Sequence, residues 1–163
     1  MKKLPPKTNA ARILDQAGIK YELMAYDVDE SDLSATTVAQ KVGMSPELIY
    51  KTLVTRGDKT GVLVACIPAH HELNLKALAK VSSNKKVEVV PLKEVQPLTG
   101  YIRGGVSPLG MKKKYPVYFQ EDILKEEKIA ISAGVRGTQI VASSQDILEI
   151  TQGKTGPISS VHN

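Results

Sequence analysis

The chain has 163 residues, of which 42% are hydrophobic and 24% charged, and it carries a formal net charge of +5. These values exclude a fibrous or disordered protein and predict one globular domain over residues 1–163, with a core spanning about residues 8–150. The longest apolar runs are only of strand length, so neither a membrane-spanning segment nor a signal peptide is expected.

Two capped helices and one strand are predicted in the first part of the chain. A helix over residues 9–18 follows a capping threonine, and a second over residues 35–43 follows a capping serine. Both segments end at glycine, the residue that most often stops a helix. Between them, residues 20–28 alternate and are rich in strand formers. A short helical turn is expected over residues 45–48, where proline takes the first helical position.

A β-hairpin is the next predicted element. Residues 49–57 and 61–69 are rich in strand-forming side chains, and turn-forming residues lie between them. A helix over residues 75–83 follows, capped by Asn74 and with apolar residues at helical spacing. Residues 85–90 then form a short predicted strand, and residues 91–98 a short helix that opens with proline.

The last third of the chain predicts three strands and a final helix. The strand-like runs cover residues 115–120, 128–133 and 138–142. A capped helix is expected over residues 143–151, and a loose tail over residues 151–163. Because strands and helices interleave but the late strands have short connections, we expect a mixed α/β fold whose sheet is not purely parallel.

A glycine-rich segment over residues 99–114 reads TGYIRGGVSPLGMKKK. It lacks the G-x-x-x-x-G-K-[ST] spacing of a phosphate-binding P-loop. Around Ser107 there is one residue too many for the G-x-S-x-G motif of serine hydrolases, and Pro108 lacks the N–H that helps form an oxyanion hole. Its glycines would let the main chain approach an anion or a carbonyl closely. The alternative is a long irregular turn.

Two lysine features are candidates for binding an anion. In the strand over residues 49–57, Lys51 shares one face with Ile49 and Leu53. Its ammonium must therefore reach solvent, pair with an acid or line a cavity, where it could hold a ligand carbonyl or phosphate. The lysine run at residues 112–114 could contact phosphates, or it is a solvated face.

No catalytic triad and no metal site emerge from the polar residues. The histidines are His70, His71 and His162, and no second Cys/His cluster accompanies them, so neither a metal nor a cofactor is expected. The single cysteine, Cys66, excludes an internal disulfide and fits a reducing cytoplasm. With six Tyr, one Phe and no Trp, the chain suits a protein that grips one end of a nucleic acid. A second glycine turn over residues 132–137 is either a plain hairpin or a further pocket wall.

Four motifs occur in the order and approximate spacing of one protein family: YKTLV at 50–54, NLKALAK at 74–80, TGYIRGGVSPLGMKKK at 99–114 and SAGVRG at 132–137. Over residues 21–150 the chain resembles the YbaK-type aminoacyl-tRNA deacylases, relatives of the editing insertion domain of bacterial prolyl-tRNA synthetase. The resemblance implies a mixed, mostly antiparallel sheet that is partly barrel-like and surrounded by helices.

The resemblance also implies a function. It implies trans-acting hydrolysis of mischarged tRNA, chiefly Cys-tRNA(Pro), in which the substrate's own thiol attacks the ester carbonyl. The protein would supply position and electrostatics, which agrees with the missing triad. The implied partners are the aminoacylated 3′ end of tRNA and, as a candidate, prolyl-tRNA synthetase, with no membrane and no DNA. Two alternatives stay open: a deacylase specific for Ala- or Ser-tRNA, and a non-catalytic module that binds tRNA or a synthetase.

The family's functional residues can be carried over by position. Lys51 matches its essential lysine, Gly104 a loop glycine close to the aminoacyl group, and Ser132 a pocket serine, so these three are the expected catalytic residues. The expected substrate-binding residues lie in or beside the two glycine segments: Tyr26, Gly100, Tyr101, Gly105, Gly134, Arg136 and Gly137. The expected tRNA-binding residues are Lys112, Lys113 and Lys114.

The chain departs from the family pattern at three places. Val135 stands where the family often has lysine, and Gln139 where YbaK has an acidic residue near the pocket. The region around Leu33 and Ser34, which should help form the amino-acid pocket, is one residue shorter than in YbaK. These departures bear most on the preference for cysteine over alanine or serine.

Overall fold

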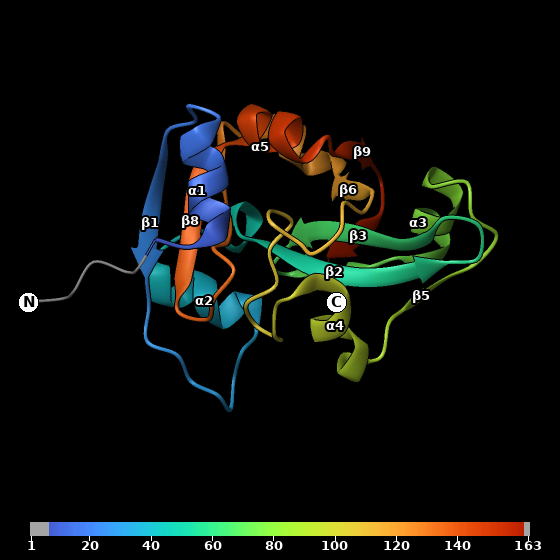
Figure 1. Cartoon of the computed structure of the whole chain (residues 1–163), viewed down its shortest axis with the longest axis horizontal. Helices are drawn as coiled ribbons and strands as arrows, with labels where there is room; N and C mark the ends of the chain where they lie inside the picture. Colours follow the sequence, from blue (N-terminus) through green and yellow to red (C-terminus); the bar gives the residue numbers. More distant parts are fainter. Residues whose placement is uncertain (1–6, 162–163) are drawn as a thin grey trace, which may run out of the picture.

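Helices are interspersed among strands through residues 7–161, the part of the chain that the structure, a computed structural model, describes (Figure 1). Residues 1–6 and 162–163 lie outside this part. They include His162 and the start of the N-terminal segment, in which no signal peptide is expected. No helix within it is long and apolar enough to cross a membrane. Nor do the described residues contain a group of three or more His, Cys, Asp or Glu side chains that could hold a metal ion.

The largest sheet has five strands in the order β5-β2-β3-β6-β9. Strands β2 (Tyr50–Gly57) and β3 (Gly61–Pro68) form the predicted antiparallel hairpin. Strand β5 (Val87–Val89) pairs antiparallel with the far end of β2. On the other side of the hairpin, β6 (Val117–Gln120) lies parallel to β3, and β9 (Lys154–Gly156) lies parallel to β6. This sheet is therefore mixed, as predicted.

A second, antiparallel sheet has the order β1-β8-β7. It joins β1 (Tyr21–Ala25), β8 (Thr138–Ser143) and β7 (Lys128–Ser132). A parallel bridge between Ile49 and Ala130 links β7 to the residue that precedes β2. The two sheets therefore meet beside the start of β2, next to Lys51.

The chain is a mixed α/β protein in which most strand pairs are antiparallel, as expected. The partly barrel-like arrangement is not formed, because the strands of the described residues fall into three separate sheets. One bridge between the two larger sheets is too little pairing to close them around a common axis.

The third sheet corrects the expectation of a loose tail over residues 151–163. Strand β4 (His71–Leu73), which was not predicted, pairs antiparallel with β10 (Ser159–Val161). The buried carboxamide of Gln120 accepts two main-chain hydrogen bonds from the same segment. The tail is thus ordered by strand pairing up to residue 161, and its last two residues lie outside the described part.

Five helices surround the sheets in the described part of the chain, and each lies where the sequence predicts one. Polar caps explain four of the starting points: Thr8, Ser34, Asn74 and Ser143 each accept a hydrogen bond from a main-chain N–H in the first turn. Short 3₁₀ turns occupy Pro46–Leu48 and Glu121–Lys125. The helices are α1 (Asn9–Gln16), α2 (Ala35–Val42), α3 (Leu75–Val81), α4 (Leu92–Thr99) and α5 (Ser144–Thr151).

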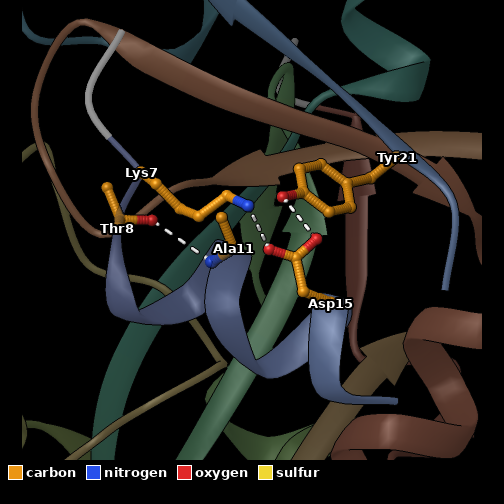
Figure 2. Close-up of polar contacts among 5 residues, drawn as sticks. All are labelled: Lys7, Thr8, Ala11, Asp15 and Tyr21. Carbon is orange, nitrogen blue, oxygen red and sulfur yellow. Dashed lines mark hydrogen bonds and ion pairs between the residues drawn. The ribbon is translucent and has the colours of Figure 1, made fainter. Parts of the chain in front are cut away.

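Helix α1 is tied to β1 by a small polar network (Figure 2). Thr8 Oγ1 accepts a hydrogen bond from the N–H of Ala11 at 3.2 Å, which fixes the first turn. In the last turn of the helix, Asp15 pairs with Lys7 and accepts a hydrogen bond from the Tyr21 hydroxyl at 2.9 Å. Because the Lys7 and Asp15 side chains are exposed, their ion pair orients α1 rather than contributing much stability.

The main core lies between the two larger sheets and helices α1 and α5. Alternation along β3 explains how it forms: Val64 and Cys66 enter this cluster, while Leu63, Ala65 and Ile67 enter a second cluster with α3. Strand β3 is thus buried on both faces. It provides a rigid base for β2, the strand that carries Lys51.

Candidate functional site

A cavity of about 660 Å³ lies beside β2. It is lined by both β2 and the residues before it, by α2 and the loop that precedes this helix, and by the segment from the end of β5 into α4. Arg103, Gly104 and Val106 close one side, and Ser132 and Gln139 close the end near the second sheet. Helices α2 and α4 flank the cavity and both lie below β2 in Figure 1. Its volume is typical of small-molecule sites, which span roughly 300–1,000 Å³.

Lys51 lines this cavity, the third of the three environments considered for it. Its Nζ donates a hydrogen bond to the carbonyl oxygen of Ala69 at 3.1 Å, and the side chain is half-buried. Burial lowers the pKa of Lys51 below 10.5, and the charge of Glu72 partly opposes that shift. An ammonium has three N–H donors, so donors beyond the one used by Ala69 can meet an ester carbonyl or a phosphate oxygen.

Ser132 and Gln139 face each other across β7 and β8 at one end of the cavity. Both are buried, with 8% and 5% of their surface exposed. Ser132 Oγ accepts a hydrogen bond from the N–H of Gly134 at 3.1 Å, which leaves its own hydrogen available to a ligand. The Oε1 atom of Gln139 is buried without a partner among the described residues. Tyr26 completes this end of the lining, and its N–H donates to the carbonyl of Gly137.

The two glycine segments pack directly on each other, and residues 133–137 form the turn of the antiparallel β7–β8 hairpin, with Ser132 at the cavity. A Cβ on Gly105 would lie 3.2 Å from main-chain atoms of Val135 and Arg136. Arg136 Nε in turn donates to the carbonyl of Arg103 at 2.8 Å. Gly104 has φ +84°, and a Cβ there would approach Arg136 and Leu33. Glycine is thus required at these positions for close approach and for the backbone conformation.

Several expected substrate-binding residues shape this loop but are absent from the lining of the cavity in the described chain. Tyr101 donates a hydrogen bond to the carbonyl of Leu109, and its ring lies over Gly134, where a Cβ would come within 2.9 Å. Gly100 ends α4 with φ +85°. The remaining ones, Gly105, Arg136 and Gly137, lie in the packed glycine segments just described.

The three lysines of the run are exposed and lie away from the cavity. The side chain of Lys112 covers Gly100, at 3.3 Å from a Cβ placed there. Lys113 and Lys114 line a different hollow of about 200 Å³, beside α1 and α5. Within the same loop, Ser107 is fully buried and its Oγ accepts a hydrogen bond from the N–H of Leu109 at 3.3 Å. Ser107 therefore braces the loop and is no exposed nucleophile.

The histidine pair is placed outside the cavity lining of the described residues. His71 is buried, and its Nδ1 lies 2.7 Å from the Oγ of Ser159 in β10. The His70 ring meets the His71 ring edge to face, with centroids 4.7 Å apart. Both histidines thus take part in the packing of the third sheet.

Sequence reasoning missed the apolar end of the cavity. Val89, at 54% exposure, and Leu92, at 59%, are among the most exposed large apolar side chains of the described chain, and both line the cavity. The strand and helix that carry them were predicted, but nothing in a single sequence showed that this strand pairs beside Lys51. Arg103 was likewise missed, although it lies inside the glycine-rich segment.

Comparison with known proteins gives the cavity a context. Residues 30–150 match the aminoacyl-tRNA editing domain family. The chain is 46% identical over 159 residues to a curated Enterococcus faecalis protein, the proposed Cys-tRNA(Pro)/Cys-tRNA(Cys) deacylase EbsC. That alignment covers 98% of this chain and 97% of the relative.

Solved structures share the fold. A proposed trans-editing enzyme for prolyl-tRNA synthetase superposes with a TM-score of 0.80 at 24% identity, covering 97% of this chain and 99% of the other. The hypothetical protein APE2540 gives a TM-score of 0.82 at 22% identity, covering 91% and 97% of the two chains.

Proposed function

Because the chain belongs to the aminoacyl-tRNA editing domain family, we propose that it deacylates mischarged tRNA, with Cys-tRNA(Pro) as its main substrate. One observation carries the proposal: the half-buried Lys51 ammonium is held at the wall of a cavity large enough for an aminoacyl nucleoside. The curated relative, which covers nearly the whole chain, is itself named for cysteinyl-tRNA.

The chemistry proposed for this site needs no nucleophile from the protein. The thiol of the cysteinyl group attacks its own ester carbonyl, so a C–S bond forms, the C–O bond to the ribose breaks, and the thiol proton passes to the ribose oxygen. Water then hydrolyses the cyclic thioester. Holding the ester in a reactive geometry is the main contribution that the cavity makes, because intramolecular attack gains strongly from positioning.

Lys51 is assigned the electrostatic part of this reaction. As negative charge develops on the ester oxygen, an N–H donor of the ammonium stabilises it in a partly desolvated site. Ser132 is a second donor for the same oxygen or for the amino acid, and the main chain at Gly104 forms the opposite wall. The protein's own thiol is unsuited to attack, because Cys66 is fully buried and burial raises its pKa to about 12.

A deacylation panel tests the proposal. The protein should accelerate the loss of cysteine from Cys-tRNA(Pro) but not of S-methylcysteine or serine, which lack a free thiol. Cys66→Ala should retain turnover. Including Cys-tRNA(Cys) separates selectivity for the amino acid from selectivity for the tRNA. Acceleration of none of these substrates would exclude the enzyme, and equal loss of Ala- or Ser-tRNA would exclude the thiol mechanism.

The other functional interpretations are outcomes of the same experiment. Salt-sensitive tRNA binding without turnover would indicate a binding module. Addition of prolyl-tRNA synthetase tests the partner that the name of one structural neighbour suggests, because a required partner would raise the rate at limiting protein. We place the activity in the cytoplasm, where aminoacylated tRNA is made and used.

A further inference from the structure

One edge of β2 has no strand partner over the middle of its length. Strand β3 pairs with all of β2 on one side. On the other side β5 reaches only Thr55, Arg56 and Gly57, and the bridge to β7 is made by Ile49, before β2 begins. Within the described chain the edge between these two contacts is open, and residues 50–54 line the cavity there.

The main chain of Thr52 points out of this open edge. Val54 gives the direction, because its carbonyl accepts a hydrogen bond of 3.1 Å from the N–H of Val90, which follows β5. Main-chain groups alternate in direction along a strand, so Thr52, two residues earlier, presents its N–H and C=O on the same side. The side chain of Thr52 agrees with this direction. Its Oγ1 lies 3.7 Å from the Sγ of Cys66, its partner in β3, and side chains approach this closely at strand pairs that share no main-chain hydrogen bonds. The main chain of Thr52 is therefore not bonded to β3.

Thr52 therefore offers a donor and an acceptor side by side to whatever occupies the cavity. Unpaired main-chain groups inside a protein cost free energy unless water or a ligand satisfies them. The side chain of Thr52 offers no further group to a ligand at this edge, because its hydroxyl is directed at Cys66.

The cavity wall beyond Thr52 is apolar and uncharged. A strand rises about 3.3 Å per residue, so this wall begins roughly 10 Å from the Lys51 end. It offers nothing to balance an α-ammonium or a phosphate, but it suits the flat face of a neutral ring. Its members come from β2, the end of β5 and α4: Val54, Val89, Val90, Leu92 and Val95.

We propose that the open edge at Thr52 and this apolar wall bind the adenine of the 3′-terminal adenosine, a step that rests on the proposed function. The exocyclic amino group of adenine donates to the C=O of Thr52, and a neighbouring ring nitrogen accepts from its N–H. The base packs against Val89 and Leu92. The ribose ester then extends toward Lys51 and Ser132, so the aminoacyl group occupies the polar end.

Amide exchange in the free protein tests the open edge. The N–H of Thr52 should exchange with solvent much faster than those of Lys51 and Leu53, which point the other way and pair with β3. Adenosine, without any amino acid, should shift the Thr52 amide resonance and protect it. Exchange of Thr52 as slow as that of its two neighbours would overturn the proposal, since the group would then have a protein partner.

The donor–acceptor pattern is tested with inosine. Inosine carries an oxygen where adenosine carries the amino group, so in the same pose it has no donor at that position for the Thr52 carbonyl. Adenosine should bind at least about tenfold more tightly than inosine, because the Thr52 carbonyl would be left without a donor. Equal affinities, or no adenosine binding at about 10 mM, would overturn the assignment.

The apolar wall is tested with Leu92→Asp and a matched control. Leu124→Asp makes the same change at another exposed leucine, 66% accessible, outside the cavity lining. The Leu92 variant should raise the KM for Cys-tRNA(Pro) by roughly tenfold with little change in kcat. Equal KM values for the two variants would contradict the proposal that the apolar wall binds the adenine.

These outcomes separate the two proposals. Deacylation of Cys-tRNA(Pro) without an adenosine response at Thr52 rejects the nucleobase site alone. Adenosine binding at Thr52 without deacylation of any tRNA rejects the proposed deacylase activity alone.

Discussion

Lys51 combines partial burial with a charge, and both properties can be measured. Removing one donor from a developing oxyanion lowers kcat by about 10²–10³ in other enzymes, so Lys51→Met should lose deacylation to that extent. Lys76→Met, at an exposed position of α3, is the control and should retain full activity. A Lys51→Met enzyme with wild-type kcat would contradict the role assigned to the ammonium.

The same variant has a signature in stability. Burial lowers the folded-state pKa of Lys51 below 10.5, so in the pH window just under 10.5 the unfolded chain binds more protons than the folded one. Stability from this group therefore rises with pH across that window. The unfolding free energy of the wild type, measured by urea denaturation, should therefore increase relative to that of Lys51→Met as the pH rises toward 10.5.

Gly105 is the residue at which the two glycine segments meet. A Cβ there would press on main-chain atoms of Val135 and Arg136, which cannot swing aside as a side chain can. Gly105→Ala should cost about 1–3 kcal/mol and lower deacylation, because the loop beside Gly104 must shift. A Cβ added at Gly61, the first residue of β3, would have no neighbour within 4 Å, but the residue has a φ of +72°. The Gly61→Ala variant should have a lower melting temperature in thermal unfolding and an unchanged rate of deacylation.

At the scale of elements, local chemistry predicted most of the fold. The caps at Thr8, Ser34 and Asn74, the hairpin turn and the late strands depend on residues close in sequence, and all are present. Strands β4, β9 and β10 escaped prediction because they are short and exist only through partners far away in the chain. Their sequence carries no periodicity of its own.

Gln120 shows how such non-local order is maintained. Its Oε1 accepts hydrogen bonds from the N–H groups of Ile158 and Ser159, at 2.8 and 2.9 Å. Gln120→Leu should destabilise the protein by about 1–3 kcal/mol or more, because these N–H groups would be left without an acceptor. Thermal unfolding measures the loss. The exposed Gln40→Leu in α2 is the control, and equal melting temperatures would contradict the bracing role.

The candidate site was predictable only in part, because some of it depends on contacts between residues that lie far apart in the chain. Lys51, Gly104, Ser132 and Tyr26 do line one cavity, whereas most other residues expected to bind substrate hold the loop in shape. A motif marks which residues a family shares but not whether each touches the ligand or braces its neighbours. The apolar end depends on where β5 stops along β2, a register that no local pattern encodes.

At the scale of the whole molecule, the net charge of +5 leaves open which lysines meet tRNA. Lys112, Lys113 and Lys114 are exposed and outside the cavity, so we predict that they contact phosphates rather than the ester. Their triple alanine variant should raise the KM for tRNA and reduce the salt slope of binding by about 2, at about 0.7 per phosphate contact. Cleavage of cysteine ethyl ester should not change. An unaltered salt slope would place the tRNA on another face.

The pairing of β4 with β10 has a consequence for how activity first appears. Strand β4 begins two residues after Ala69, whose carbonyl holds Lys51, and β10 is among the last described segments to leave the ribosome. Strand β8, which carries Gln139, is also made late and pairs with β1 near the beginning. Nascent or stalled chains that lack β8 and β10 therefore lack the polar end of the cavity and the strand that pairs with β4. Folding dominated by such distant contacts is slow, so competence to proofread should arise in one late step after synthesis.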